Sequence, residues 1–222
     1  MIAISAHFGT LHNRLAAIAD DLAVKGWSHQ PGLLPADLLE GLRAELIALD
    51  DAAGLEAAGI GRQDALMLDR DIRKARITWM DGESAPQRAF LAWAEMFRLH
   101  LNRELLLGLF ELEASFAVYP PGGFYERHVD SFCGARNRIV SLVVYLNADW
   151  RAEDGGTLAI FAAESDASDA PLIRLMPVGG DAVFMMSEDV PHAVEPTIAK
   201  RLAIAAWWRV NQSSADRVDP IG

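Results

Sequence analysis

The sequence offers little that would cross-link the chain or hold it in a membrane. Its 222 residues include one cysteine, Cys133, which excludes an internal disulfide and a cysteine-rich zinc framework. No apolar run reaches the roughly 18 residues that a membrane span needs. The first residues also lack the basic region and the long apolar stretch of a signal peptide. These absences predict a soluble protein of a reducing compartment, most simply the cytoplasm, with no membrane partner.

Positive charge is also in short supply. The chain has 20 Lys and Arg against 31 Asp and Glu, so its formal net charge is −11. A polyanion such as a nucleic acid would repel such a surface on average, and we expect no nucleic-acid partner. Apolar residues make up 51% of the chain and charged residues 23%, a composition that excludes disorder and predicts a folded core.

Helical spacing of apolar residues dominates the chain up to about residue 110. The three predicted helices have their apolar stripes at Leu11–Leu22, Leu38–Ile47 and Phe90–Leu105. Gly26 can stop the first helix, and Pro35 suits the first turn of the second. Ser84 and Gln87 form a capping-box pattern at the start of the third. A short strand is expected at Ile77–Met80, and a loop or hairpin from Gly54 to Asp71.

Beyond Glu111 the pattern changes to short β-branched and aromatic runs separated by turns rich in glycine and proline. The predicted strands are Ser115–Tyr119, Arg138–Leu146, Thr157–Phe161, Leu172–Met176, Ala182–Met186 and Arg201–Val210. Many short strands after a helical region predict an α+β fold with a sandwich or barrel of strands. We expect one domain over residues 1–222, with residues 1–110 as mainly helical support and residues 111–211 as the β core.

The first candidate for chemistry is the triplet His128-Val129-Asp130. Residues i and i+2 of a strand point to the same side, so an imidazole and a carboxylate can meet at one metal ion. His192, at the edge of another predicted strand, can supply a third ligand, and two histidines with one carboxylate form the facial triad of non-haem Fe(II) oxygenases. On its own the triplet is common by chance, and a lone histidine is more often packed or exposed than a ligand.

The second candidate is Arg201, which begins the last predicted strand. It shares one strand face with Ala203, Ala205 and Trp207, and the two small alanines leave room for a ligand beside the sheet. A guanidinium is always charged and can bind a carboxylate through two hydrogen bonds. Taken alone, an arginine at a strand start is more often a solvated surface residue.

The ordered set of these motifs resembles the 2-oxoglutarate- and Fe(II)-dependent dioxygenases. Within them it is most similar to the prolyl 4-hydroxylases related to the hypoxia-factor prolyl hydroxylases and their bacterial counterparts. The similarity extends from about Asp71 to Trp208. It is carried by Asp71-Ile-Arg73, Ile77-Thr-Trp79, Tyr125-x-Arg127-His-Val-Asp130, Val144-Tyr-Leu-Asn147, Gly155-Gly-x-Leu158 and His192-Ala-Val-Glu-Pro196, followed by Arg201 and Trp207.

The resemblance implies a double-stranded β-helix, a distorted jelly roll, backed by the N-terminal helices. It also implies roles for individual side chains. His128, Asp130 and His192 would hold Fe(II), and Arg201 and Tyr145 would bind the distal carboxylate of 2-oxoglutarate. Tyr119, Leu158, Val194 and Trp207 would line the cosubstrate pocket, while Tyr125, Arg138, Trp207 and Arg73 would lie near the substrate.

The implied reaction couples decarboxylation of 2-oxoglutarate, giving succinate and CO₂, to the insertion of one oxygen atom from O₂ at C4 of a proline. The expected cofactors are Fe(II), 2-oxoglutarate and O₂, with ascorbate as an optional reductant. The expected partner is a protein that carries the target proline, with elongation factor Tu as a candidate. The alternatives are an oxygenase of a small molecule, of another side chain or of a nucleobase, a non-catalytic 2-oxoglutarate or metal sensor, and a metallohydrolase.

Two departures from the family pattern leave the substrate open. Lys74-Ala-Arg76 stands where the family usually has glycine-aspartate. The loop from Ser131 to Asn137, which contains Cys133, differs in length from that of animal members. A surface thiol without a role is the simpler interpretation of Cys133, against a redox-sensitive or metal-proximal one.

Overall fold

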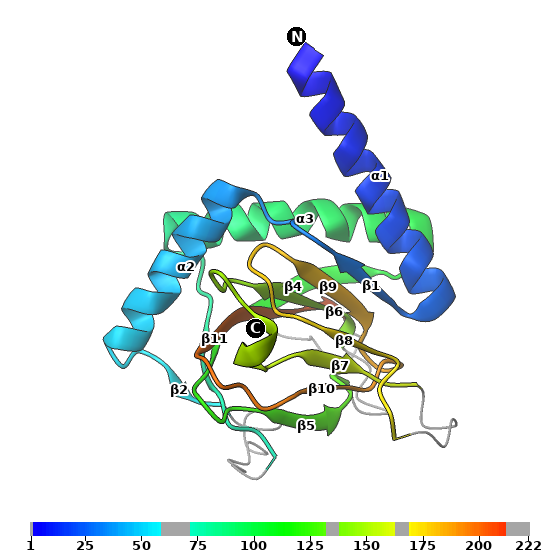
Figure 1. The fold of residues 1–222 in the computed structure, drawn as a ribbon. Coiled ribbons are helices and arrows are strands. Elements are labelled where there is room, and N and C mark those ends of the chain that lie inside the picture. Colours follow the sequence, from blue (N-terminus) through cyan, green and yellow to red (C-terminus); the bar gives the residue numbers. More distant parts are fainter. Residues whose placement is uncertain (1, 59–71, 132–137, 163–168, 212–222) are drawn as a thin grey trace, which may run out of the picture.

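A computed structural model describes residues 2–58, 72–131, 138–162 and 169–211, with side chains from residue 11 onward (Figure 1). The helices are α1 (Ile2–Lys25), α2 (Ala36–Asp51) and α3 (Ala85–Leu105), with a short 3₁₀ turn at Ala152–Asp154. The first helix therefore begins well before the predicted Leu11. Pro35 is the residue before α2 rather than part of its first turn.

The start of α3 agrees with only half of the predicted capping box. The hydroxyl of Ser84 accepts a hydrogen bond from the backbone N–H of Gln87 at 3.1 Å. The Gln87 side chain does not reach back to the Ser84 backbone as a capping box requires. Its Oε1 accepts from the N–H groups of Asp81 and Gly82, and its Nε2 donates to Glu45 on α2 at 2.7 Å. Hydrogen bonds to Asp81, Gly82 and Glu45 therefore take the place of the contact that a capping box would make.

The strands form two antiparallel sheets. Their bounds are β1 (Trp27–Gln30), β2 (Glu56–Ala57), β3 (Arg76–Trp79), β4 (Leu109–Tyr119), β5 (Tyr125–His128), β6 (Arg138–Tyr145), β7 (Leu158–Ile160), β8 (Ile173–Leu175), β9 (Ala182–Met186), β10 (His192–Val194) and β11 (Arg201–Val210). The 7-stranded sheet has the order β1-β9-β6-β11-β4-β3-β2, and the 4-stranded sheet the order β5-β10-β7-β8.

The large sheet separates two apolar cores. On one face, alternate residues such as Phe116, Phe184 and Trp208 pack with the apolar stripes of all three helices. On the other face, residues such as Tyr145 and Ala203 pack with Leu158 and other residues of the small sheet. Figure 1 shows the helices on one side of the large sheet and strands β5, β10, β7 and β8 on the other. The functional side chains lie in this second space, between the sheets.

Several predicted strands have nearly the observed bounds, and others differ. Strand β9 matches its prediction, and β6 ends one residue before the predicted Leu146. Strand β4 begins at Leu109, six residues before the predicted Ser115. Strands β1 and β2 were not predicted, although β2 falls inside the segment expected to be a loop or hairpin. Within the described residues, no helix has the length and apolar character to cross a membrane.

Candidate active site

The pairing of two short strands brings the candidate histidines together. His192 begins β10 and lies opposite His128, the last residue of β5. Asp130 lies just beyond the end of β5 rather than within it, as the strand prediction had assumed. The backbone N–H groups of Asp130 and Ser131 both donate to the carbonyl of Ser187, at 3.0 and 3.1 Å, which fixes the bend that presents the carboxylate.

These three side chains form a potential metal site. One ligand atom from each of His128, Asp130 and His192 lies within 4.8 Å of the others. Each histidine places its Nε2 3.6 Å from a carboxylate oxygen of Asp130. Each Nδ1 is bonded to a backbone carbonyl, that of Glu126 at 2.7 Å and that of Val190 at 3.0 Å. A carbonyl accepts only from a protonated nitrogen, so Nε2 keeps its lone pair for a metal, as in many metal centres.

The electrostatics of the cluster favour the protonation states that a metal requires. Burial lowers the pKa of His192 to about 4, and the positive charge of His128 acts in the same direction. Burial alone would raise the pKa of Asp130, but His192, His128 and a hydrogen bond from Ser141 outweigh it and hold that pKa well below its usual range. At neutral pH His192 is therefore neutral and Asp130 is ionised, which are the states that bind a divalent ion.

Arg201 is a buried cation that has no carboxylate partner among the described residues. Its side chain is only 1% exposed, and its Nε donates to the carbonyl of Gly156 at 2.9 Å. Its Nη2 is buried and has no hydrogen-bond partner in the described part of the chain. The guanidinium lies 5.0 Å from the ring centroids of both Tyr119 and Tyr145. A charge held this way is costly unless an anion pairs with it, so the geometry marks an anion site.

Tyr145 adds a second hydrogen-bond donor to this anion site. Its side chain is fully buried, and its hydroxyl also lacks a partner among the described residues. Burial raises the pKa of Tyr145 to about 12, against the opposing effect of the positive charge of Arg201. The hydroxyl therefore stays protonated at physiological pH and can donate to a carboxylate next to Arg201.

A cavity of about 550 Å³ between the sheets connects the metal cluster with Arg201. All the predicted site residues line it except Tyr145, which is buried beside Arg201. Ala203 and Ala205 line the wall next to Arg201, and Leu158 and Val194 supply apolar wall on the small sheet. The cavity has the volume expected for a small-molecule site.

The opposite, outer end of the cavity is aromatic and cationic. The guanidinium of Arg73 lies 4.6 Å from the ring of Tyr125, which stacks on the ring of His128 with centroids 3.6 Å apart. The guanidinium of Arg138 lies 4.0 Å from the ring of Trp207. The indole N–H of Trp207 and the Nε of Arg73 are buried and without partners in the described residues. These are donors suited to the carbonyl groups of a polypeptide.

Three supporting positions were given no individual role from the sequence, although Gly156 belongs to the Gly155-Gly-x-Leu158 motif. Gly156 has φ +65°, and a side chain there would lie 3.1 Å from Cδ of Arg201, so this position must stay small. Ser141 and Ser187 share a hydrogen bond of 2.8 Å, and Ser141 also bonds to Asp130. The glycine pair was visible as a turn signal, but only the fold reveals what it touches. Cys133 lies outside the described residues.

Comparison with known proteins agrees with this geometry. Residues 114–209 match the 2OG-Fe(II) oxygenase superfamily. The chain is 34% identical over 147 residues to Egl nine homolog 1 of Homo sapiens, covering 63% of this chain and 33% of that protein. It is 32% identical over 148 residues to prolyl hydroxylase EGLN3 of Homo sapiens, covering 63% and 59%. The chain thus spans about a third of the length of the first relative.

Two solved structures resemble most of the chain. A Pseudomonas putida prolyl-4-hydroxylase has a TM-score of 0.77 and 40% identity, covering 88% of this chain and 98% of that one. A prolyl hydroxylase from Trichoplax adhaerens, in complex with a peptide fragment of hypoxia inducible factor, has a TM-score of 0.79 and 20% identity, covering 91% and 92%. These similarities confirm the double-stranded β-helix and its α+β class.

Proposed function

We propose that this chain, which belongs to the 2OG-Fe(II) oxygenase superfamily, is a prolyl 4-hydroxylase that acts on a protein proline. As a 2-oxoglutarate-dependent dioxygenase it uses Fe(II), 2-oxoglutarate and O₂. In this proposal residues 1–222 act as one catalytic domain. One observation carries the assignment: a buried arginine, whose Nη2 has no partner in the described part of the chain, lies in the same cavity as two histidines and an aspartate whose ligand atoms converge.

The donor set fits the cofactors of the family. Nε2 of His128, Nε2 of His192 and a carboxylate oxygen of Asp130 would hold Fe(II), leaving other coordination positions open for cosubstrate and O₂. Nη2 of Arg201 and the hydroxyl of Tyr145 would bind the distal carboxylate of 2-oxoglutarate. With these groups bound, iron supplies the oxidising chemistry, in which O₂ is split between succinate and the hydroxylated substrate.

The chain itself positions the reactants and keeps water away. Gly156 holds the Nε of Arg201, so the rest of the guanidinium is aimed at the cosubstrate before it binds. Tyr119, Leu158 and Val194 give the pocket apolar walls, which strengthen the pairing between Arg201 and a carboxylate. The same walls limit side reactions of the oxidant.

Substrate binding is assigned to the outer end of the cavity. Tyr125, Trp207 and Arg73 combine aromatic surface with buried donors that lack partners in the described chain, and Arg138 adds a second cation. EGLN3 and the Pseudomonas putida enzyme, both named prolyl hydroxylases, support a proline within a polypeptide as the target. Elongation factor Tu is our candidate substrate, and the cytoplasm, where it works, is the proposed location.

The first test is the turnover of 2-oxoglutarate to succinate by the Fe(II)-loaded protein, with and without elongation factor Tu. We expect elongation factor Tu to stimulate this turnover and to gain the mass of one oxygen atom at a proline. Asp130→Ala should abolish both activities because it removes a metal ligand. The control is Asp20→Ala, an exposed position on α1. Full turnover by Asp130→Ala would contradict the assignment.

Mass spectrometry of whole-lysate proteins, incubated with and without the enzyme, extends the test beyond one candidate. A new hydroxyproline in another protein would replace elongation factor Tu and keep the proposed reaction. If succinate forms but no protein gains oxygen, the prolyl assignment is wrong and hydroxylation of a small molecule replaces it.

A further inference from the structure

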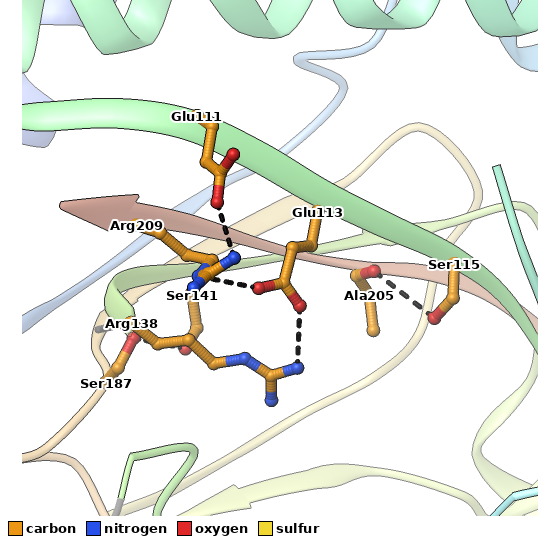
Figure 2. A network of polar contacts seen from close by, with 8 residues as sticks. All are labelled: Glu111, Glu113, Ser115, Arg138, Ser141, Ser187, Ala205 and Arg209. Atoms are coloured by element: carbon orange, nitrogen blue, oxygen red, sulfur yellow. Dashed lines mark hydrogen bonds and ion pairs between the residues drawn. The ribbon is translucent and has the colours of Figure 1, made fainter. Parts of the chain in front are cut away.

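Four charged side chains form an alternating row that ends at Arg138, which lines the outer end of the cavity. We call Glu111, Arg209, Glu113 and Arg138 the charge ladder (Figure 2). Arg209 bonds Glu111 through Nη1 and Glu113 through Nε, the latter at 2.9 Å. The other carboxylate oxygen of Glu113 accepts from Nη2 of Arg138 at 3.0 Å. The charges alternate from one end to the other, and the four sum to zero.

The strand register explains why the two arginines of the charge ladder need glutamates beside them. Arg209 on β11 lies directly opposite Arg138 on β6 and directly opposite Glu111 on β4. Two arginines opposite each other repel, and Arg209 is only 4% exposed, so water screens it poorly. Burial lowers the pKa of Arg138, and the charge of Arg209 acts in the same direction. Glu113 lies between the two guanidinium groups and binds both.

The ladder ends where the substrate is proposed to bind. Arg138 lines the cavity and keeps 18% of its side chain exposed, whereas its guanidinium lies against Trp207. Glu113, on β4, binds Nη2 of Arg138, as Figure 2 shows, while the Arg138 side chain also lines the cavity. Without Glu113, the repulsion from Arg209 would favour a displaced Arg138.

We propose that Glu113 is a positioning residue that fixes the guanidinium of Arg138 against Trp207 for substrate binding, with Arg209 and Glu111 holding Glu113 in place. The proposal rests on the proposed function in one respect, namely that Arg138 contacts the protein substrate. It makes Glu113 a determinant of substrate affinity, although it need not touch the substrate. It assigns no part of the ladder to iron or 2-oxoglutarate.

One test needs no substrate. Phenylglyoxal modifies accessible guanidinium groups, and peptide mass mapping follows its rate at each arginine. Glu113→Gln should raise the rate at Arg138 several-fold over wild type, while the rate at Arg73, which is outside the ladder, stays the same. The control is Glu95→Gln, which removes a carboxylate paired to Arg98 on the surface of α3. An unchanged rate at Arg138 would overturn the proposal.

The second test is kinetic and uses elongation factor Tu as the probe. Glu113→Gln should raise the KM for this protein about tenfold, equivalent to ~1.4 kcal/mol, with kcat and the KM for 2-oxoglutarate nearly unchanged. Glu113 acts through Arg138, so the double variant Glu113→Gln/Arg138→Met should be no worse than Arg138→Met alone. Additive losses would contradict a positioning role and indicate a separate effect.

Two outcomes separate this proposal from its premise. If wild-type protein does not turn over elongation factor Tu, the proposed substrate is wrong, and the phenylglyoxal comparison still decides the role of Glu113. If Glu113→Gln does not fold, Glu113→Asp takes its place, because it keeps the charge beside Arg209 and shortens the reach to Arg138. Unchanged phenylglyoxal rate and KM in folded Glu113→Asp would overturn the proposal.

Discussion

Two buried arginines, one at the inner end of the cavity and one next to its outer end, differ in how they are paired with carboxylates. At the inner end, Arg201 is 1% exposed and its Nη2 has no partner among the described residues. Next to the outer end, separated by Glu113 from the cavity-lining Arg138 in the charge ladder, Arg209 is 4% exposed and is paired with both Glu111 and Glu113. Two carboxylates neutralise one buried arginine, whereas the described residues offer none to the other, which supports our proposal that Arg201 binds an anionic cosubstrate.

The difference also separates stability from function. The paired outer arginine belongs to a network in which its removal would take a partner from two partly buried carboxylates, Glu111 and Glu113, although Glu113 would keep Arg138. The unpaired inner arginine carries its desolvation cost until a ligand arrives, so the folded protein is held in a state prepared for binding. This contrast predicts that substitution by methionine lowers the free energy of unfolding at Arg209 and does not lower it at Arg201.

The largest expected effect is at the outer end. Arg209→Met should lower the free energy of unfolding by about 3–5 kcal/mol, because it leaves Glu111 and Glu113 without their shared partner in a partly buried site. Chemical denaturation of the protein without 2-oxoglutarate measures this change. A loss below about 1 kcal/mol, the value typical of an exposed ion pair, would mean that the ladder is not a structural network.

The ladder also shows where sequence reasoning stopped. Glu111 and Glu113 made the segment before Ser115 look unlike a strand, so the predicted strand began too late. Their partners, Arg138 and Arg209, are far away in the chain, and nothing local indicates that the four charges meet. Strand β1, Trp27–Gln30, escaped prediction because its four residues show no clear alternation and it is held by pairing with β9.

Other parts were readable because their signals are local or motif-based. The apolar stripes predicted the helices, and Ser84 marked the start of α3, although Gln87 was drawn away by Glu45. The metal ligands were first proposed from the His128-Val-Asp130 triplet and His192, the resemblance then named the other site residues, and the structure brings the three ligand atoms together. Their roles stay predictions until metal binding is measured. Gly156 and Ser141 required the fold, because their contacts are tertiary.

A smaller effect, which the two ends share, concerns the ionisation of their tyrosines. Burial raises the pKa values of Tyr125, at the outer end, and Tyr145, at the inner end, to about 12. Both should therefore ionise well above the usual value of about 10, as followed by the ultraviolet absorbance of tyrosinate. Folding keeps these protons on, so the stability they contribute is complete below about pH 10 and is lost as the pH rises through 12.

Adding 2-oxoglutarate to the tyrosine titration separates the inner end of the cavity from the outer end. A carboxylate bound beside Arg201 would accept a hydrogen bond from Tyr145. Relative to the anaerobic Fe(II) protein alone, adding 2-oxoglutarate should therefore raise the pKa of Tyr145 further and leave that of Tyr125 nearly unchanged. Tyr145→Phe assigns the transition. Equal shifts at both tyrosines would contradict a cosubstrate confined to the inner end.

The most direct test of the contrast is the free energy of unfolding of wild type and Arg201→Met, each with and without 2-oxoglutarate, in the presence of Fe(II) and the absence of oxygen. Arg201→Met should be at least as stable as wild type without 2-oxoglutarate, because it removes an unpaired buried charge. 2-Oxoglutarate should then stabilise wild type strongly and the variant little, since its affinity for the variant falls by ~2–5 kcal/mol. A variant that is several kcal/mol less stable without 2-oxoglutarate, or equally stabilised by it, would contradict the claim that Arg201 is held in reserve for the cosubstrate.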